Sequence, residues 1–176
     1  MTAIAEEIDY WRARLGRSPQ PEELEALTRA SIEAGSRLSA VDYVRARRTA
    51  TRATGAMALS FEAIDVLLLP TTATLPPLTG AIDGRTNVFS LERWNELSYR
   101  YAPYTELFNI TGQPAISLPL AEAGVVGLPI GVQLVAPLGH DARLLNLAAW
   151  LEREQPWAGR LAALRQRLVA QAAASA

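Results

Sequence analysis

The pattern of apolar and polar residues is most regular between Thr105 and Ala136, and the rest of the chain is arranged around this stretch. Two short apolar runs in it, Ala115–Leu120 and Ile130–Ala136, each follow soon after a proline and have the length of β-strands. A glycine-containing link at residues 121–127 joins them and is short enough for a hairpin, without by itself fixing antiparallel pairing. Two apolar strands this short are expected to be buried in a larger sheet.

A third strand is predicted at Asp65–Pro70, where a continuous apolar run is bounded by Asp and Pro. Such a run is typical of a strand covered on both faces, in the middle of a parallel or mixed sheet. Apolar residues spaced three and four apart predict helices elsewhere, over residues 4–15, 21–35, 39–63, 90–101, 104–110, 141–155 and 160–173. The expected fold is therefore α/β, with a mixed β-sheet flanked by helices, and residues 1–176 are expected to form a single domain.

Local signals set several of the expected element ends. Ser39 and Asp42 have the spacing of a capping box, in an acidic variant, at the start of a long helix. Pro21 suits the first position of a helix, and Gly112 permits the positive φ of a tight turn. In the long helix, residues at spacings of three and four suggest close approach to a neighbouring element, and they are Tyr43, Ala46, Ala50, Ala53, Met57 and Phe61. One side is expected to face the core in the helix from Asp141, with Leu144, Leu147, Ala148 and Leu151, and in the last helix, with Leu161, Leu164 and Leu168.

Composition favours a folded globular protein, since 49% of the residues are hydrophobic and 20% are charged. The formal net charge is -1, so no overall field attracts nucleic acid or an anionic membrane. One side of a predicted helix carries Arg45, Arg48 and Arg52. We interpret it as a face exposed to solvent in preference to a patch that binds nucleic acid. The start of the chain is acidic and no apolar run approaches the ~20 residues of a membrane span, so a soluble cytoplasmic protein is expected, consistent with the absence of cysteine.

The residues that could carry chemistry are few. All 17 basic residues are arginine, so a lysine base or Schiff-base former is excluded in this chain. His140, the single histidine, precedes a predicted helix and is interpreted as a cap residue. The loop at residues 71–90 is long enough to be functional, but a plain surface connection explains it equally well. By chemistry alone, no catalytic residue, metal site or cofactor is predicted.

Several motifs, taken together, resemble the C-terminal part of the amidase signature family. They are Phe108-Asn-Ile-Thr-Gly-Gln-Pro-Ala-Ile-Ser-Leu-Pro119, Leu128-Pro-Ile-Gly-Val-Gln-Leu-Val135, Asp141-x-x-Leu-Leu145, Ser39-Ala-Val-Asp-Tyr43 and Phe61-x-x-x-Asp65-Val-Leu-Leu-Leu-Pro-Thr71. The resemblance covers roughly residues 21–157, in the order and spacing of the family. The ending Glu154-Gln-Pro-Trp157 is similar to the branch that contains the 6-aminohexanoate cyclic-dimer hydrolase type.

The resemblance implies hydrolysis of an amide C–N bond through an acyl-enzyme. In this family a nucleophilic serine is activated by a second serine in a cis peptide and by a lysine, all in the N-terminal half. This chain contains neither the Gly/Ser-rich motif of those serines nor any lysine. The resemblance therefore implies the C-terminal portion of an amidase, incomplete relative to the family and inactive alone, which supplies scaffold and part of the substrate pocket.

By the same resemblance, four residues ahead of the Gly112 turn are candidates for the substrate-pocket wall, although core packing would explain each equally well: Tyr101, Tyr104, Thr105 and Phe108. Asn109 and Gly112 are interpreted as residues that fix the turn. The expected partner is an N-terminal amidase half, with a small amide substrate bound only after complementation. The alternative is a non-catalytic module, derived from an amidase, that binds other molecules or self-associates. Neither nucleic acid nor a membrane is expected as a partner.

Overall fold

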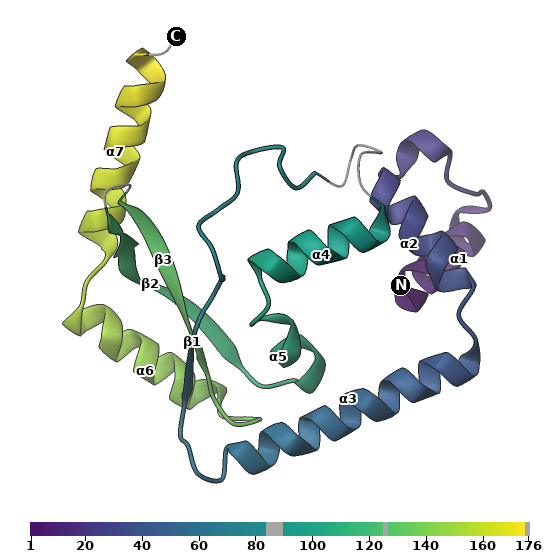
Figure 1. The fold of residues 1–176 in the computed structure, drawn as a ribbon, viewed down its shortest axis with the longest axis horizontal. Coiled ribbons are helices and arrows are strands. Elements are labelled where there is room, and N and C mark those ends of the chain that lie inside the picture. Colours follow the sequence, from purple (N-terminus) through teal and green to yellow (C-terminus); the bar gives the residue numbers. More distant parts are fainter. Residues whose placement is uncertain (84–89, 125–126, 175–176) are drawn as a thin grey trace. The chain divides into compact units, whose positions relative to one another are not determined.

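The computed structural model describes residues 1–83, 90–124 and 127–174 (Figure 1). Contacts within the chain divide it into two compact units. Unit 1 comprises Met1–Thr51 and Pro76–Tyr101, and unit 2 comprises Arg52–Leu75 and Ala102–Ala176. That residues 1–176 act as one domain stays a prediction.

Unit 1 is helical. It contains α1 (Thr2–Leu15), a 3₁₀ turn η1 (Pro21–Glu23), α2 (Ala26–Ser36), the first half of α3 and α4 (Leu91–Tyr101). The first residues of the chain lie directly against α2, because a Cβ at Gly35 would come 2.5 Å from the carbonyl oxygen of Met1. The glycine is therefore what allows the two helices to approach at this point.

The helix predicted from Pro21 is interrupted after one turn, because Leu24 is extended with φ -121° and ψ 133°. The turn closes on itself through Glu23, whose carboxylate accepts a hydrogen bond from the Gln20 N–H at 2.8 Å. The same carboxylate binds both terminal nitrogens of Arg17, at 2.7 and 2.9 Å. This hydrogen bonding, with the Arg17 bond as the largest cause, lowers the pKa of Glu23 to about 2.

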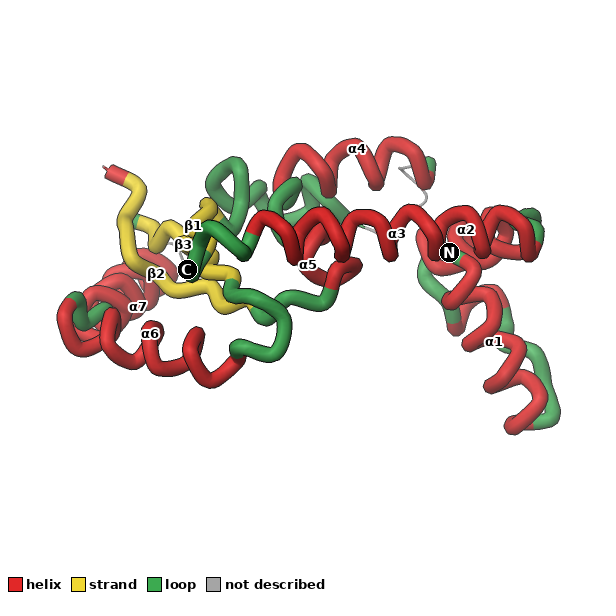
Figure 2. Tube along the Cα trace, turned by 90° about the horizontal axis from the view of Figure 1, so that it is seen from below, coloured by secondary structure: helices red, strands yellow, loops and turns green. Residues whose placement is uncertain are grey.

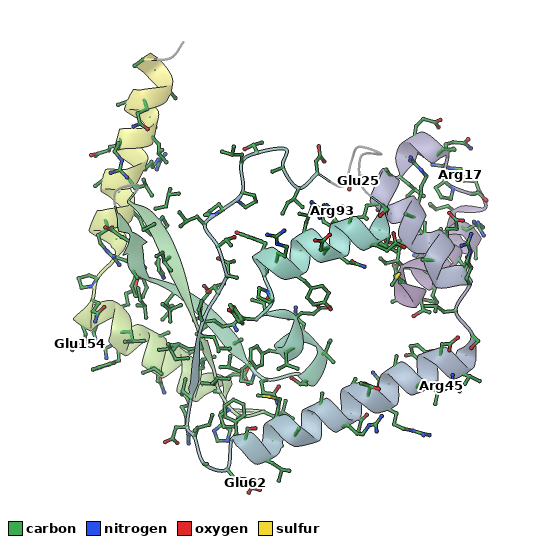
Figure 3. All side chains as sticks on the ribbon, viewed as in Figure 1. Arg17, Glu25, Arg45, Glu62, Arg93 and Glu154 are labelled. Carbon is green, nitrogen blue, oxygen red and sulfur yellow. The ribbon has the colours of Figure 1, made fainter. Side chains whose placement is uncertain are left out.

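The long helix α3 (Ala40–Ser60) begins as its capping signal predicts. The Ser39 N–H donates to Asp42 Oδ2 at 3.0 Å, and the Asp42 N–H donates to Ser39 Oγ at 3.2 Å. The expected inner residues are half-buried at Ala50, Ala53, Met57 and Phe61, whereas Tyr43 and Ala46 are exposed, and no residue of α3 is fully buried. On its polar side, Arg45 lies 3.8 Å from Asp42 and points outward (Figure 3).

Unit 2 is built on a three-stranded sheet in the order β1-β3-β2, formed by β1 (Leu67–Pro70), β2 (Ala115–Ala123) and β3 (Leu128–Val135). The predicted hairpin is confirmed, because β2 and β3 pair antiparallel. The pairing of β1 with β3 is also antiparallel, so the predicted central position of that run in a parallel or mixed sheet is wrong within this chain. It forms an edge strand, and Leu68 stays 64% exposed because no further strand or helix of the described residues covers it.

The core of unit 2 lies between one face of the sheet and α6 (Asp141–Glu154), which runs along that face (Figure 2). Leu118 and Leu134 from the strands pack with Leu144 and Ala148 from the helix, and Trp157 packs at the border of this cluster. The predicted inner side of this helix is confirmed. The predicted inner side of α7 (Ala158–Ala174) is wrong, since none of its described residues is buried.

None of the helices among the described residues is both long and apolar enough to cross a membrane.

The Arg17–Glu23 pair gives a direct test of the turn in unit 1. The carboxyl carbon of Glu23, followed by NMR during acid titration, is expected to show a midpoint near pH 2. Because the folded-state pKa is depressed, the stability that this pair adds is present above about pH 4.5 and is lost as the pH falls toward 2. Arg17→Ala should move the midpoint up, whereas Arg14→Ala on α1 should not. An unchanged midpoint in Arg17→Ala would contradict the assignment.

Candidate functional site

The face of the sheet turned away from α6 carries the candidate site. Side chains alternate between the two faces of a strand, so Leu118 and Leu134 point to the core while Ser117 and Gln133, which pair across β2 and β3, point to the other side. The backbone extends the β1 pairing by one residue, because the Thr71 N–H donates to the Gly131 carbonyl at 2.9 Å. Thr71 thereby joins the same face.

Two hydroxyl groups meet on this face above a glycine. Thr71 Oγ1 lies 2.5 Å from Ser117 Oγ, and the bond connects β1 to β2 across β3. A Cβ at Gly131 would lie 2.7 Å from the Thr71 oxygen and 2.9 Å from the Ser117 oxygen, so only glycine leaves room for this pair. Ser117 is exposed and Thr71 is half-buried, which makes the pair a polar, accessible contact point.

Near Gln133, the face is joined to the turn that precedes α5 (Glu106–Thr111). Gly112 has φ +85° and its N–H donates to the Phe108 carbonyl at 2.8 Å, so the predicted left-handed turn is confirmed. Thr111 is buried and donates its hydroxyl to the Leu107 carbonyl at 2.8 Å and to the side-chain oxygen of Gln113. Thr111 and Gln113 thus hold the turn, a role that was predicted for Asn109, which is exposed.

Three of the four predicted pocket residues lie together at this end of unit 2. Phe108 is buried with 4% exposed, Thr105 is half-buried at the start of α5, and Tyr104 is exposed in the preceding turn. The Tyr104 carbonyl accepts a hydrogen bond from the Gln133 side chain at 3.4 Å, which ties this turn to β3. Tyr101 ends α4 and belongs to unit 1. A substrate-binding role for these four residues stays a prediction.

The pair Thr71–Ser117 was not predicted, because the two residues are 46 positions apart and only the β1–β3–β2 pairing brings them together. The one signal available in the sequence is Gly131, because a glycine inside a predicted strand often marks a place where other groups approach the backbone closely.

The bonding partner of the Ser117 hydroxyl is another hydroxyl, that of Thr71. A hydroxyl needs a stronger base beside it before it can take up a proton, and among the described contacts neither oxygen is bonded to a carboxylate or an imidazole. Among the described residues, no group of three or more His, Asp or Glu side chains could hold a metal ion. The lowered carboxyl pKa values belong to exposed helix starts, such as Asp42 bonded to Ser39 and Glu92 bonded to its own backbone N–H and to Ser90. The arrangement can donate and accept hydrogen bonds.

His140 occupies the position before α6, as predicted, but its side chain makes no capping hydrogen bond. Its backbone carbonyl accepts the Leu144 N–H at 3.2 Å, so the main chain alone makes the helix start.

The described strands and turn coincide with the region in which the sequence matches known proteins. The amidase family model matches residues 1–145, and the chain therefore belongs to the amidase family. AmiB2 of Mycobacterium tuberculosis, named as an amidase, is 37% identical over 140 residues, which are 80% of this chain and 29% of AmiB2. AmiC of the same organism, also named as an amidase, is 42% identical over 101 residues, 56% of this chain and 20% of AmiC.

Solved structures agree with this assignment. The structure of a 6-aminohexanoate cyclic dimer hydrolase superposes with a TM-score of 0.77 at 30% identity and covers 89% of this chain. A bacterial aryl acylamidase of the amidase signature family shows the same fold, with a TM-score of 0.67 at 24% identity over 89% of the chain. This chain spans about a third of each, with 33% of the first and 32% of the second. The predicted family and the incomplete α/β fold are confirmed, and the family match begins earlier than residue 21. The branch of the family stays a prediction.

Gly131 provides a test of the hydroxyl contact. Gly131→Ala should lower the free energy of unfolding of the chain by about 1–3 kcal/mol, because the new methyl group displaces Thr71 and Ser117. Chemical denaturation measures the loss. Gly159→Ala is the matched control, since nothing lies within 4 Å of its Cβ position in α7 and the change should stabilise by about 0.5–1 kcal/mol. Equal stability of the Gly131 variant and the parent protein would contradict the packing described.

Proposed function

We propose that this chain is the C-terminal portion of an amidase and supplies scaffold and part of the substrate pocket for hydrolysis of an amide C–N bond. One observation carries the proposal: the family match extends over residues 1–145, while the chain spans only 29% of AmiB2 and 33% of the cyclic dimer hydrolase. The substrate class is a small amide, in keeping with the names of these relatives.

The chain is proposed to be inactive alone. Its family resemblance assigns catalysis to a serine, a cis-serine and a lysine, and this sequence has no lysine. The one exposed hydroxyl of the candidate site, on Ser117, has a threonine hydroxyl beside it in place of a base. The function of the chain would therefore depend on a second polypeptide segment that carries the catalytic groups.

The partner proposed is an N-terminal amidase half, and the sheet of unit 2 supports it in two ways. Ser117 on the face away from α6 is exposed, and the outer edges of β1 and β2 can accept further strands. Tyr101, Tyr104, Thr105 and Phe108 are proposed to bind substrate in the assembled enzyme, and the bond from Gln133 to the Tyr104 carbonyl supports this for the segment before α5. A cytoplasmic location is proposed with this function, since the absence of cysteine suits a reducing compartment.

A second candidate is a non-catalytic, self-associating module. It is favoured by large apolar side chains left exposed in unit 2, such as Leu68 on β1 and Leu145 on α6. Size-exclusion chromatography with light scattering separates the two functions, because a self-associating module is expected to be an oligomer at micromolar concentration, whereas a fragment that needs another segment is not.

The assay for inactivity uses the purified chain with simple aliphatic and aryl amides and follows the release of ammonia or amine. We expect no hydrolysis above the buffer rate. Hydrolysis that is present in the parent protein and lost in Ser117→Ala would overturn the proposal, because it would show a working nucleophile within this chain.

A second assay tests for complementation. It adds to the purified chain the part of AmiB2 that lies outside its 140 matched residues. Hydrolysis that requires both polypeptides supports the proposal. In that mixture, Phe108→Ala should lower turnover by about tenfold or more through loss of pocket packing. Thr49→Ala on α3 serves as the control and should leave turnover unchanged.

A further inference from the structure

Helix α7 is attached to unit 2 through its polar side. Arg160 Nη2 donates to the Pro119 carbonyl at 2.7 Å, and the same guanidinium lies 3.7 Å from the Glu122 carboxylate. About two turns further along, Arg167 Nη2 reaches the Gly127 carbonyl at 3.5 Å. All three contacts are with the β2–β3 hairpin, so they fix which side of the helix faces it.

The apolar side of α7 consequently faces away from the hairpin. At 3.6 residues per turn, Leu161, Leu168 and Ala172 fall on one stripe, roughly a third of a turn around the helix from Arg160 and Arg167. Leu161 is 38% exposed and Leu168 is 49% exposed, although a stripe of this kind ordinarily packs into a core. The residues lining the hollow along this stripe all belong to α7: Leu161, Leu164, Arg165, Leu168, Val169 and Ala172.

The charges on α7 limit which kind of molecule can bind the apolar residues Leu161, Leu164, Leu168, Val169 and Ala172, together called the α7 stripe. Arg165 lies within it, and no acidic residue occurs between Ala158 and Ala174, while arginine occurs three times. Two copies of α7 packed on one another would bring arginines together without any carboxylate, which opposes a homodimer through this helix. An anionic membrane is also a poor match, because each basic residue near its surface contributes about 1 kcal/mol and two of the three arginines are bound to the hairpin.

We propose that the α7 stripe docks an acidic amphipathic helix of a partner polypeptide. The apolar side of that helix packs along Leu161, Leu164 and Leu168, and one of its carboxylates pairs with Arg165. The interaction lies apart from the candidate site and does not depend on the amidase proposal.

The test uses a labelled synthetic peptide of repeated Leu-Ala-Gln-Leu-Glu-Ala-Glu heptads, whose glutamates discourage pairing with itself. A second peptide carries lysine in place of every glutamate. Fluorescence anisotropy with the full chain should show binding of the acidic peptide and none of the basic one. Arg165→Glu should weaken binding of the acidic peptide by about tenfold and should allow the basic peptide to bind. Leu168→Ser should weaken binding of the acidic peptide by a similar factor, and circular dichroism confirms that α7 is retained.

Two control variants distinguish binding at the α7 stripe from a general effect of the net charge of the chain. Gln166→Glu places a carboxylate on a different side of α7, and Arg47→Glu makes the same charge change on α3; each should leave acidic-peptide binding within about twofold. Equal binding of both peptides, or no binding of the acidic one, overturns the proposal. So does an oligomer of the free chain that Leu168→Ser dissociates, since a second copy would then cover the stripe. Binding to phosphatidylserine vesicles that Arg165→Glu abolishes, in place of peptide binding, also overturns it.

Discussion

The central strand β3 is the constraint on which unit 2 depends. It pairs with β1 on one side and with β2 on the other, and Val135 at its end is fully buried. One face of β3 places Leu134 against α6, and the opposite face places Gln133 against the turn before α5. The hydrophobic core and the candidate site are therefore two sides of one strand, and a shift of one residue in its register would exchange them.

Gly131 combines three roles in this strand. The pairing of β2 with β3 is irregular between Leu118 and Ala121, where two residues of β2 stand opposite this single glycine. Its carbonyl accepts the Thr71 N–H, and its missing side chain admits the Thr71 and Ser117 hydroxyls. The bulge, the attachment of β1 and the polar contact thus share one position, which explains why the site forms at this point of the sheet.

Sequence reasoning succeeded where the determining interactions are local. The hairpin, the Ser39–Asp42 cap and the Gly112 turn each depend on residues close together in the chain, and all three are present. It failed where the outcome depends on what lies opposite an element. The apolar run of β1 and the leucines of α7 have the pattern of covered surfaces, yet the described part of this chain leaves Leu68, Leu161 and Leu168 exposed.

The candidate site was predictable only in part, for the same reason. A family resemblance named Tyr104, Thr105 and Phe108, which lie next to one another because they are close in the chain, and their binding role stays a prediction. It could not locate Thr71 and Ser117, because their contact arises from strand pairing between distant segments. Residue spacing along a chain carries no information on such a contact until the sheet order is known.

The proline in the bulge has a mechanical consequence for the helix that follows the sheet. Pro119 has no N–H, and it lies where the β2–β3 ladder is interrupted, so its carbonyl is open to the guanidinium of Arg160. One anchor of α7 on the hairpin thus lies at an irregularity in a strand about forty residues earlier. Insertion or deletion of one residue in β2 would move this anchor and rotate the helix about its own axis. A change in the bulge would therefore alter which residues of α7 are exposed to solvent.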